Sequence, residues 1–404
     1  MLNNPDFVTA RDILLGAVKA VGTESVALED CAGRVLGEDI EAAENVPGFD
    51  RSPYDGYAFR SADSVGASKE HPITLRIVEE VPAGAVSQIP CTEGTAVKIL
   101  TGAPLPEGAD CVIMHEKTAF NDKNVKIFET MKAGSNIVFA GSDIRRGDIL
   151  ARKGQLIDAG TAGTLASQGI ACPKVYRRPK VAVISTGNEV VEVGTETEAG
   201  KIFNSNRYML TAALESLGCE VVYLGISSDR PEDIAGSVEH GLEHCDAVIS
   251  TGGVSAGDYD FTPAAMELAG VRMLFRGVEL KPGMACAYGE KNGKIVCGLS
   301  GNPASALTNF HAVAAPPLKK LAGRSDCMPE IIKFRLKTDF KKKSPKTRLL
   351  RGKLDLSGGT IGIVLQGDQG NAVLISAIGC NAMAIVPAGS GPLKAGTILE
   401  GFLI

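Results

Sequence analysis

The sequence predicts a multidomain protein of the α/β and β classes, with a central α/β domain built on a parallel sheet. The first observation is that strand-like and helical patterns alternate between residues 179 and 326, as they do in βαβ units. The second is that short alternating strands, separated by Pro and Gly turns, fill residues 49–140 and return after residue 326. Because 404 residues suffice for several cores of about 100–150 residues each, we expect three or four domains.

The composition is that of an ordinary globular protein, with 44% hydrophobic and 22% charged residues. No apolar run approaches the roughly 18 residues that span a bilayer, and the N-terminus lacks a basic region followed by an apolar core. A net charge of −5 argues against general nucleic-acid affinity. The ten cysteines include no C-x-x-C pair, which favours thiols in a reducing compartment over zinc or disulfides. We therefore expect a cytoplasmic protein with no membrane or nucleic-acid partner.

The N-terminal part predicts a helix, a β domain and a return to the first domain. Residues 7–21 are expected to form an amphipathic helix, and Thr9 with Asp12 is expected to make its capping box. Within residues 49–140, strands are predicted at 74–78, 96–100 and 110–114. Hairpin turns at 143–154 and an Ala-rich helix at 159–169 follow. The β domain at residues 49–140 is thus expected to interrupt a first domain that is formed by the segments before and after it.

The central part predicts a parallel sheet covered by helices. Apolar runs typical of buried strands occupy residues 181–184, 220–224, 247–249 and 294–297. A helix with Ser205 as its expected N-cap separates the first two runs and stops at Gly218. After a linker near residue 325, alternation at 330–336 and 382–386 predicts a small closing β domain.

Three turns rich in small residues fall at the carboxyl ends of these predicted strands. They span residues 185–189, 251–260 and 299–305. Open parallel sheets bind ligands at this edge, and backbone N–H groups near helix starts stabilise phosphates. The turns therefore predict a phosphate or nucleotide site. Its candidate residues are Ser185, Thr186, Gly187, Gly252, Gly253, Ser255, Gly301, Asn302, Pro303 and Ser305.

Several charged residues accompany these turns. Glu189, Asp229, Asp258 and Asp260 offer the hard oxygen ligands that suit Mg²⁺. Asp229 is equally suited to cap the helix that starts near Pro231. The spacing of Lys281 fits a partner for a phosphate or oxyanion and a solvated lysine in a turn equally well.

Two further patterns are better explained without a ligand. His240 and His244 have the i, i+4 spacing of metal-binding pairs, but without a third ligand nearby they favour an exposed helix face. The basic run from Lys341 to Arg351 favours a solvated hairpin over a polyanion site, because Ser344 and Pro345 mark a turn.

Eight short motifs are spread along nearly the whole chain. They are Ser-x-x-Asp-Gly-Tyr-Ala from Ser52, Thr-Gly-Ala-Pro-Leu-Pro from Thr101, Gly-x-Asp-Ile from Gly141, Ser-Thr-Gly-Asn-Glu from Ser185, Asn-Ser-Asn-Arg from Asn204, Thr-Gly-Gly-Val-Ser-x-Gly-x-x-Asp from Thr251, Lys-Pro-Gly from Lys281 and Gly-Asn-Pro-x-Ser from Gly301. In this order, they resemble the motifs of the molybdopterin molybdenumtransferase family, the molybdenum-insertion enzymes of molybdenum cofactor synthesis that are related to the C-terminal domain of gephyrin.

The resemblance implies four domains and a homodimer. An elongated N-terminal domain would comprise residues 1–48 and 141–178, interrupted by a β domain at 49–140. A molybdopterin-binding-type α/β domain would span residues 179–326, and a C-terminal β domain residues 327–404. The active site would lie between the α/β domain of one subunit and the interrupting β domain of the other.

The resemblance also implies substrates and catalytic residues. The substrates would be adenylylated molybdopterin and molybdate, with Mg²⁺-dependent release of AMP. The implied catalytic residues are Asp55, Thr101, Asp143, Glu189, Asp260 and Lys281, and the implied metal ligands are Asp260, Glu189 and Asp229. An upstream molybdopterin adenylyltransferase and acceptor molybdoenzymes would be partners.

Three alternatives stay open at this point. The chain could be a tungstate-selective paralogue, because spacing does not distinguish two tetrahedral dianions of similar size. It could be an inactive dimeric scaffold of the gephyrin type, or a related nucleotide hydrolase or adenylyltransferase. A dinucleotide dehydrogenase is disfavoured because no G-x-G-x-x-G turn follows the first strand of the predicted sheet.

Overall fold

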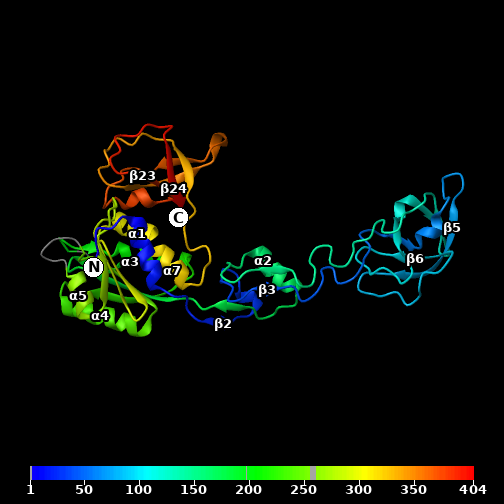
Figure 1. Ribbon diagram of the computed structural model, residues 1–404, viewed down its shortest axis with the longest axis horizontal. Coiled ribbons are helices and arrows are strands. Elements are labelled where there is room, and N and C mark those ends of the chain that lie inside the picture. The colour runs from blue at the N-terminus through cyan, green and yellow to red at the C-terminus, as the bar shows by residue number, and fades with distance from the viewer. Residues whose placement is uncertain (1, 197, 255–260) are drawn as a thin grey trace. The chain divides into compact units, whose positions relative to one another are not determined.

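The computed structural model describes residues 2–196, 198–254 and 261–404 (Figure 1). The chain divides into two compact units. Unit 1 comprises Met1–Glu38, Lys153–Ala159 and Cys172–Ile404, and unit 2 comprises Asp39–Arg152 and Gly160–Ala171. The predicted combination of a central α/β fold with separate β folds is confirmed by the elements of these two units.

Unit 1 contains a seven-stranded sheet with the order β1-β17-β18-β19-β16-β12-β15. Its strands are β1 (Leu2–Asn3), β12 (Lys180–Thr186), β15 (Glu220–Ser227), β16 (Ala247–Thr251), β17 (Arg272–Arg276), β18 (Cys286–Lys291) and β19 (Lys294–Leu299). The four strands that the sequence predicted, β12, β15, β16 and β19, run parallel. In this register Ser185 pairs with Thr251, and Thr251 pairs with Leu299. The carboxyl ends of β12, β16 and β19 therefore lie side by side.

The sheet differs from the prediction in its antiparallel strands. β17 and β18 pair antiparallel, as do β18 and β19. A tight turn joins β18 to β19, and its residues Asn292 and Gly293 have φ values of 54° and 79°. An Asn-Gly pair with two positive φ angles is the signature of a two-residue hairpin. This Asn-Gly signal was present in the sequence and would have found strand β18.

Helices cover both faces of this sheet, as Figure 1 shows for α3, α4 and α5. The helices of unit 1 are α1 (Phe7–Ala17), α3 (Ser205–Ser216), α4 (Pro231–His244), α5 (Thr262–Leu268), α6 (Pro303–Asn309) and α7 (Ala315–Leu321), with a π-helical turn at Phe310–Ala314 between the last two. One core joins α1, α3, α6 and α7 to one face, and a second core joins α4 and α5 to the other. No helix in the described part of the chain is long and apolar enough to cross a membrane.

The helix caps differ from the predicted ones. Asp6, not Thr9, caps α1, because its carboxylate accepts hydrogen bonds from the amides of Val8 and Thr9 at 3.0 Å. Asn204, not Ser205, caps α3 through the amide of Arg207. The actual caps lie three residues before Thr9 and one residue before Ser205, and their side-chain oxygens reach the orphan N–H groups of the first turn. Sequence patterns place a helix start only to within such a shift.

A closed β barrel completes unit 1, and it confirms the predicted C-terminal β fold. Its strands are β20 (Ile332–Leu336), β21 (Arg348–Asp355), β22 (Gly362–Leu365), β23 (Ala382–Val386) and β24 (Ile398–Leu403). Short strand pairs join β2 (Thr23–Ser25) to β11 (Lys174–Tyr176), and β13 (Val190–Val191) to β14 (Ile202–Phe203). Barrel residues Leu349, Met383 and Phe402 belong to the same core as one face of the seven-stranded sheet.

The prediction of a solvated basic hairpin is wrong for the end of the run Lys341–Arg351. Arg348 is 4% exposed and Arg351 is fully buried. The Arg351 guanidinium donates to the hydroxyl groups of Ser376 and Thr308 and to the carbonyl of Gly370. Burial lowers the pKa of Arg351, since its hydrogen-bond acceptors are neutral. Arg351 lies in strand β21 with its side chain in the protein interior. The number of basic residues in the sequence does not reveal this burial.

Unit 2 contains a six-stranded sheet with the order β7-β4-β6-β5-β9-β8. Its strands are β4 (Gly56–Phe59), β5 (Ile73–Val81), β6 (Thr95–Ile99), β7 (Cys111–Met114), β8 (Thr118–Phe120) and β9 (Asn124–Ile127). Three of them, β5, β6 and β7, match predicted strands. Unit 2 also pairs β3 (Ile40–Glu41) with β10 (Ile149–Ala151) and contains most of α2 (Ala159–Ser167).

Candidate functional site

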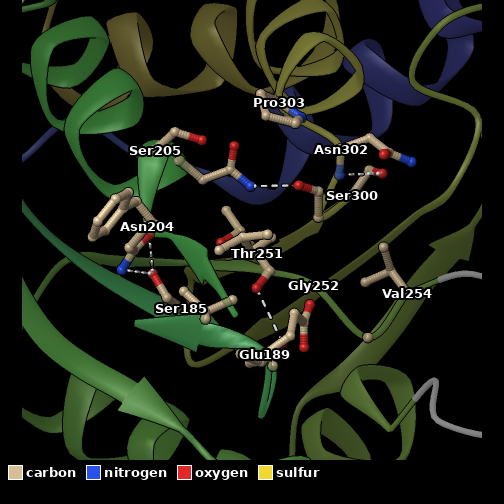
Figure 2. Close-up of a pocket in the computed structure, with 18 of the residues that line it drawn as sticks. Ser185, Glu189, Asn204, Ser205, Thr251, Gly252, Val254, Ser300, Asn302 and Pro303 are labelled. Carbon is tan, nitrogen blue, oxygen red and sulfur yellow. Dashed lines mark hydrogen bonds between the residues drawn. The ribbon is translucent and has the colours of Figure 1, made fainter. Parts of the chain in front are cut away.

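A pocket of about 390 Å³ lies at the carboxyl ends of β12, β16 and β19 in unit 1 (Figure 2). Ten predicted site residues line it: Ser185, Thr186, Gly187, Glu189, Asp229, Gly252, Gly253, Gly301, Asn302 and Pro303. The remaining lining residues are Val190, Ile202, Phe203, Asn204, Ser205, Asn206, Thr251, Val254 and Ser300. The three predicted turns therefore meet around one pocket, because their strands are neighbours in the sheet.

Other predicted residues lie elsewhere or outside the described ranges. Ser305 is buried within α6 and its amide donates to the carbonyl of Asn371. Lys281 is exposed and does not line the pocket; its amide donates to the carbonyl of Thr347 beside β21. Ser255, Asp258 and Asp260 lie outside the described residues.

Glycine is required at Gly252 for steric reasons. Gly252 has φ of +103°, and a Cβ built there would lie 2.4 Å from Thr186 Oγ1. Positive φ and this close approach both exclude a larger side chain. The Gly252 amide, however, donates to the carbonyl of Leu299 at 2.9 Å. The expectation that this amide faces a phosphate is therefore wrong, since it completes the sheet instead.

Asn204 is a pocket residue that the site prediction missed, although it stood in a recognised motif. Its amide bonds with Ser185 Oγ at 3.0 Å and with Tyr223 Oη at 3.0 Å, and Figure 2 shows the pair with Ser185. Arg207 lies over the Tyr223 ring, with its guanidinium carbon 3.9 Å from the centroid. Asn204 thus ties the end of β12 to the start of α3 and holds Ser185 in position.

Glu192 anchors the network behind Asn204. Burial raises the pKa of Glu192, but hydrogen bonds from Tyr223 and Arg207 together hold it below its usual value. Burial and the neighbouring carboxylate raise the pKa of Tyr223 to about 12. At neutral pH Glu192 is therefore ionised and Tyr223 neutral. Neither group changes its protonation state near pH 7, so the network supports Asn204 and does not transfer protons.

Asn206 offers a polar atom to a ligand. It is 8% exposed and lines the pocket, and its Nδ2 donates to the Gly301 carbonyl at 2.8 Å. Its Oδ1 is buried and has no hydrogen-bond partner among the described residues. Buried polar atoms are nearly always paired, so an unpaired one at a pocket wall indicates a ligand or water contact. The residue type and spacing alone could not have shown this.

The charged groups of the pocket are acidic. Among its described lining residues, Glu189 and Asp229 carry carboxylates and none carries a lysine or arginine side chain. Asp229 accepts a hydrogen bond from the Asn188 amide at 2.9 Å, and α4 begins without a side-chain cap. Asp229 is therefore a pocket residue and not the helix cap that the sequence also allowed.

The predicted residues of the N-terminal half lie in unit 2. Asp55 is exposed and accepts hydrogen bonds from the amide and the hydroxyl of Thr101, both at 2.7 Å. The backbone bond, followed by the hydroxyl bond, lowers the pKa of Asp55. Asp143 is exposed and its amide donates to the carbonyl of Val46. The structure thus brings Asp55 and Thr101 together within unit 2 as a hydrogen-bonded pair in which the Asp55 carboxylate is ionised.

The fold and the pocket define a class: a multidomain α/β protein with a polar, carboxylate-bearing site at the edge of a parallel sheet where open α/β sheets bind ligands. Family models match almost the whole chain. The MoeA N-terminal region (domains I and II) matches residues 6–169, a probable molybdopterin binding domain matches 182–320, and the MoeA C-terminal region (domain IV) matches 333–401.

Curated relatives agree with these models. Molybdopterin molybdenumtransferase of Staphylococcus epidermidis is 38% identical over 379 residues, covering 94% of this chain and 90% of the relative. The enzyme of the same name from Staphylococcus aureus is also 38% identical, covering 93% and 90%. The chain therefore belongs to the molybdopterin molybdenumtransferase family, and it is a transferase of molybdenum cofactor biosynthesis.

Solved structures show the same fold. A molybdopterin biosynthesis MoeA protein from Pyrococcus horikoshii has a TM-score of 0.85 and 32% identity, with 99% of each chain covered. A second solved structure, of a molybdopterin biosynthesis MoeA protein from Pyrococcus horikoshii OT3, has a TM-score of 0.85 and 30% identity. The fold similarity extends over the full length and includes both β folds as well as the α/β sheet.

Proposed function

We propose that this chain inserts molybdate into adenylylated molybdopterin and releases AMP with the help of Mg²⁺. The observation that carries the proposal is the pocket itself, which gathers nine predicted site residues from three separate turns, together with Asp229 from the loop after β15. Family membership supports the reaction class, and the unpaired Asn206 Oδ1 supports a ligand with N–H or O–H donors. Adenine, ribose and pterin groups all supply such donors.

Magnesium fits the donor set of the pocket. Two carboxylates without a lysine or arginine among the described lining residues would repel a phosphoanhydride. A divalent cation held by Glu189 and Asp229, with Asp260 as a further proposed ligand outside the described residues, would reverse that repulsion. Bound there, Mg²⁺ would neutralise phosphate charge and polarise a phosphoryl oxygen.

The chain's own residues would bind and orient the substrate. Ser185 and Thr186 line the pocket from the end of β12, and the Gly301–Asn302 turn lies beside them. The Thr186 hydroxyl donates to the Thr251 carbonyl and the Asn302 amide donates to Ser300 Oγ, so both groups are already fixed. Asn204 holds the Ser185 hydroxyl in place, so its position does not depend on the ligand. Cleavage of the phosphoanhydride would separate AMP from molybdopterin as the dithiolene takes up molybdenum. Groups fixed before binding lower the cost of reaching the transition state.

We further propose a homodimer in which Asp55, Thr101 and Asp143 of one subunit complete the pocket of the other, with Lys281 as a counter-charge. The support is family resemblance together with the state of Asp55. Its carboxylate is exposed, and hydrogen bonds from Thr101 lower its pKa. The proposed domains remain 1–48 with 141–178, 49–140, 179–326 and 327–404. An upstream molybdopterin adenylyltransferase would supply the substrate, and acceptor molybdoenzymes would receive the product.

A cytoplasmic location is part of the same proposal. All ten cysteines are free, and seven of them are buried: Cys31, Cys91, Cys111, Cys219, Cys245, Cys286 and Cys297. Free thiols persist in reducing compartments. The same reducing conditions would protect the dithiolene of the product from oxidation.

AMP release tests the function directly. The full-length chain is incubated with adenylylated molybdopterin and Mg²⁺, with molybdate, with tungstate or with neither, and AMP is quantified. We expect AMP release that requires Mg²⁺ and is greatest with molybdate. Release that is greatest with tungstate would support the tungstate-selective alternative, and no release under any condition would support a scaffold and contradict the proposed reaction.

A further inference from the structure

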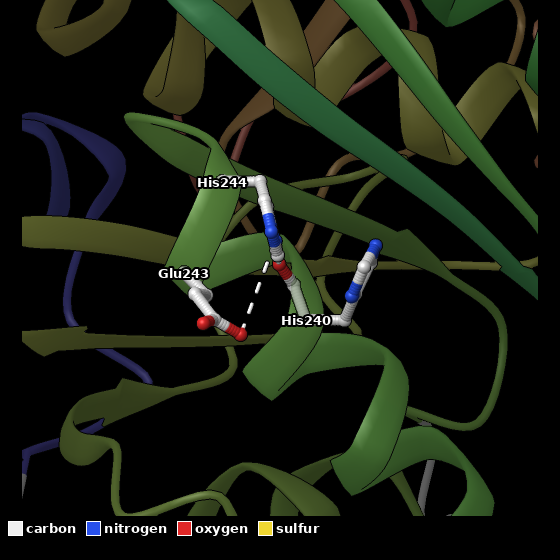
Figure 3. Close-up of side chains that lie close together, drawn as sticks. All are labelled: His240, Glu243 and His244. Atoms are coloured by element: carbon white, nitrogen blue, oxygen red, sulfur yellow. Dashed lines mark hydrogen bonds and ion pairs between the residues drawn. The ribbon is translucent and has the colours of Figure 1, made fainter.

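Helix α4 carries a cluster of three metal-binding side chains on its exposed face, as Figure 3 shows. His240, Glu243 and His244 each offer one donor atom, and these atoms lie within 4.8 Å of one another. Residues three and four apart on a helix share a face, which explains the grouping. The prediction that the two histidines lack a third ligand is therefore wrong, because Glu243 provides one.

The His244 imidazole is oriented by the helix backbone. Nδ1 of His244 lies 3.0 Å from the carbonyl oxygen of His240, and the two ring centroids are 4.5 Å apart. A carbonyl oxygen only accepts, so Nδ1 of His244 carries the proton in this hydrogen bond. The lone pair is then on Nε2. An imidazole that donates from one nitrogen and offers the other is typical of metal ligands.

The helix holds these side chains on a fixed backbone. Ile234 and Val238 are fully buried and Leu242 is 8% exposed, all in the core between α4 and the sheet. Lys294 Nζ donates to the Leu242 carbonyl, close to the end of the helix. The carboxyl end of a helix carries partial negative charge, and Glu243 adds a full one. A cation is therefore favoured on this face.

We propose that His240, Glu243 and His244 bind a divalent cation of the Zn²⁺ class, with water completing its coordination. Two imidazoles and one carboxylate suit Zn²⁺ and its neighbours Ni²⁺ and Cu²⁺, and they suit Mg²⁺ poorly. Zinc bonds of about 2.0–2.1 Å require donors roughly 3.3 Å apart. The side chains of Glu243 and His244 are 76% and 56% exposed, so they have the freedom to close on an ion.

This cluster is separate from the pocket. None of its three residues is among the described residues that line the pocket at the carboxyl ends of β12, β16 and β19. The site would therefore take a softer ion at a different place from the proposed Mg²⁺ site. Its occupancy does not depend on the proposed transferase reaction.

Calorimetric titration with ZnCl₂ tests the proposal in the full-length chain. The background is a Cys172→Ser variant, because Cys172 is an exposed thiol that could bind zinc. Excess Mg²⁺ is present throughout to occupy oxygen-ligand sites. The background is compared with the added changes His240→Ala/His244→Ala and Glu243→Gln. An added His71→Ala is the matched control, because it removes an exposed histidine from unit 2.

We expect the background and the His71→Ala control to bind one Zn²⁺ that the double histidine variant does not bind. Glu243→Gln should weaken this binding by about tenfold or more. Retention of the same stoichiometry and affinity in the double variant would overturn the site. Unchanged affinity in Glu243→Gln would overturn the three-ligand assignment. Far-UV circular dichroism verifies that the exposed substitutions leave the helix folded.

Discussion

At the scale of single residues, the site is an acidic pocket that contains one buried, unpaired hydrogen-bond acceptor. Glu189 and Asp229 supply charge, and Asn206 Oδ1 supplies the unpaired acceptor. Asn204 fixes Ser185 from behind. Asn204, Asn206 and Asp229 each hydrogen-bond to a neighbour at this edge of the sheet, so their arrangement exists before a ligand arrives.

Glu189→Gln should reduce AMP release by about 100-fold or more, because it removes a proposed metal ligand at the point of charge development. Glu189 is exposed, so the fold should remain intact. Glu215→Gln on the outer face of α3 is the matched control and should leave the rate unchanged. Equal rates for both variants would remove Glu189 from the mechanism.

Gly252→Ala should destabilise unit 1, since the new Cβ would meet Thr186 Oγ1 at 2.4 Å in a positive-φ conformation. The expected cost is about 1–3 kcal/mol in the free energy of unfolding, read as a lower midpoint in thermal unfolding. Gly301→Ala is the control, because its Cβ would meet only the Cα of Gly252 at 3.6 Å. A similar midpoint for both variants would contradict the steric account.

The sequence predicted most of the pocket because chemistry-bearing turns follow buried strands whose order a parallel sheet constrains. Ser185, Gly252 and Asn302 were found in this way. Asn206 was missed because only coordinates reveal an unpaired oxygen. Arg351 was misassigned because burial of a charged side chain depends on partners far along the chain, such as Thr308.

At the scale of elements, strand runs were predicted better than their pairing or their helix caps. The antiparallel strands β17 and β18 were not predicted, although the Asn292-Gly293 turn between β18 and β19 is a hairpin signal. Helix α1 was placed correctly at its start, but its cap was assigned to Thr9 instead of Asp6. Apolar periodicity locates elements, whereas caps and pairing are decided by individual hydrogen bonds.

Asp6→Ala should cost about 1 kcal/mol at pH 7 by removing the cap of α1. Hydrogen bonds from Thr9 lower the pKa of Asp6 below 3.8, so its stabilisation is present above the unfolded pKa. This contribution should then disappear as the pH falls from 3.8 through the lower folded pKa.

The measurement is the difference in thermal unfolding midpoint between wild type and Asp6→Ala across this pH range. Asp12→Ala is the control, since the exposed Asp12 carboxylate forms a 3.5 Å ion pair with Arg11 and does not cap the helix. It should have a smaller effect at pH 7. A larger effect for Asp12→Ala would favour the capping box that the sequence suggested.

At the scale of the whole molecule, the proposal is that two subunits build each site. The pocket of unit 1 contains Glu189, whereas Asp55 belongs to unit 2. Neither the sequence nor a single chain fixes which copies of these residues act together. Oligomeric assembly depends on surfaces that meet only between copies, and this is the part that single-chain patterns predict least.

Purified heterodimers with two different tags test the shared site. A dimer of one Asp55→Asn subunit and one Glu189→Gln subunit should retain about half of the wild-type rate, because one of its two sites keeps both residues. In the matched control, a wild-type subunit is paired with an Asp55→Asn/Glu189→Gln subunit, and activity should be lost. If each site instead lay within one chain, these two results would be exchanged.

The central claim is that the nucleotide part of the substrate binds at the carboxyl ends of β12, β16 and β19. A crystal structure of the full-length chain with AMP and Mg²⁺ measures this most directly. We expect AMP beside Ser185, Asn206 and the Gly301–Asn302 turn, with Mg²⁺ on Glu189 and Asp229. Well-defined AMP at another place, with the pocket filled only by water, would contradict the account.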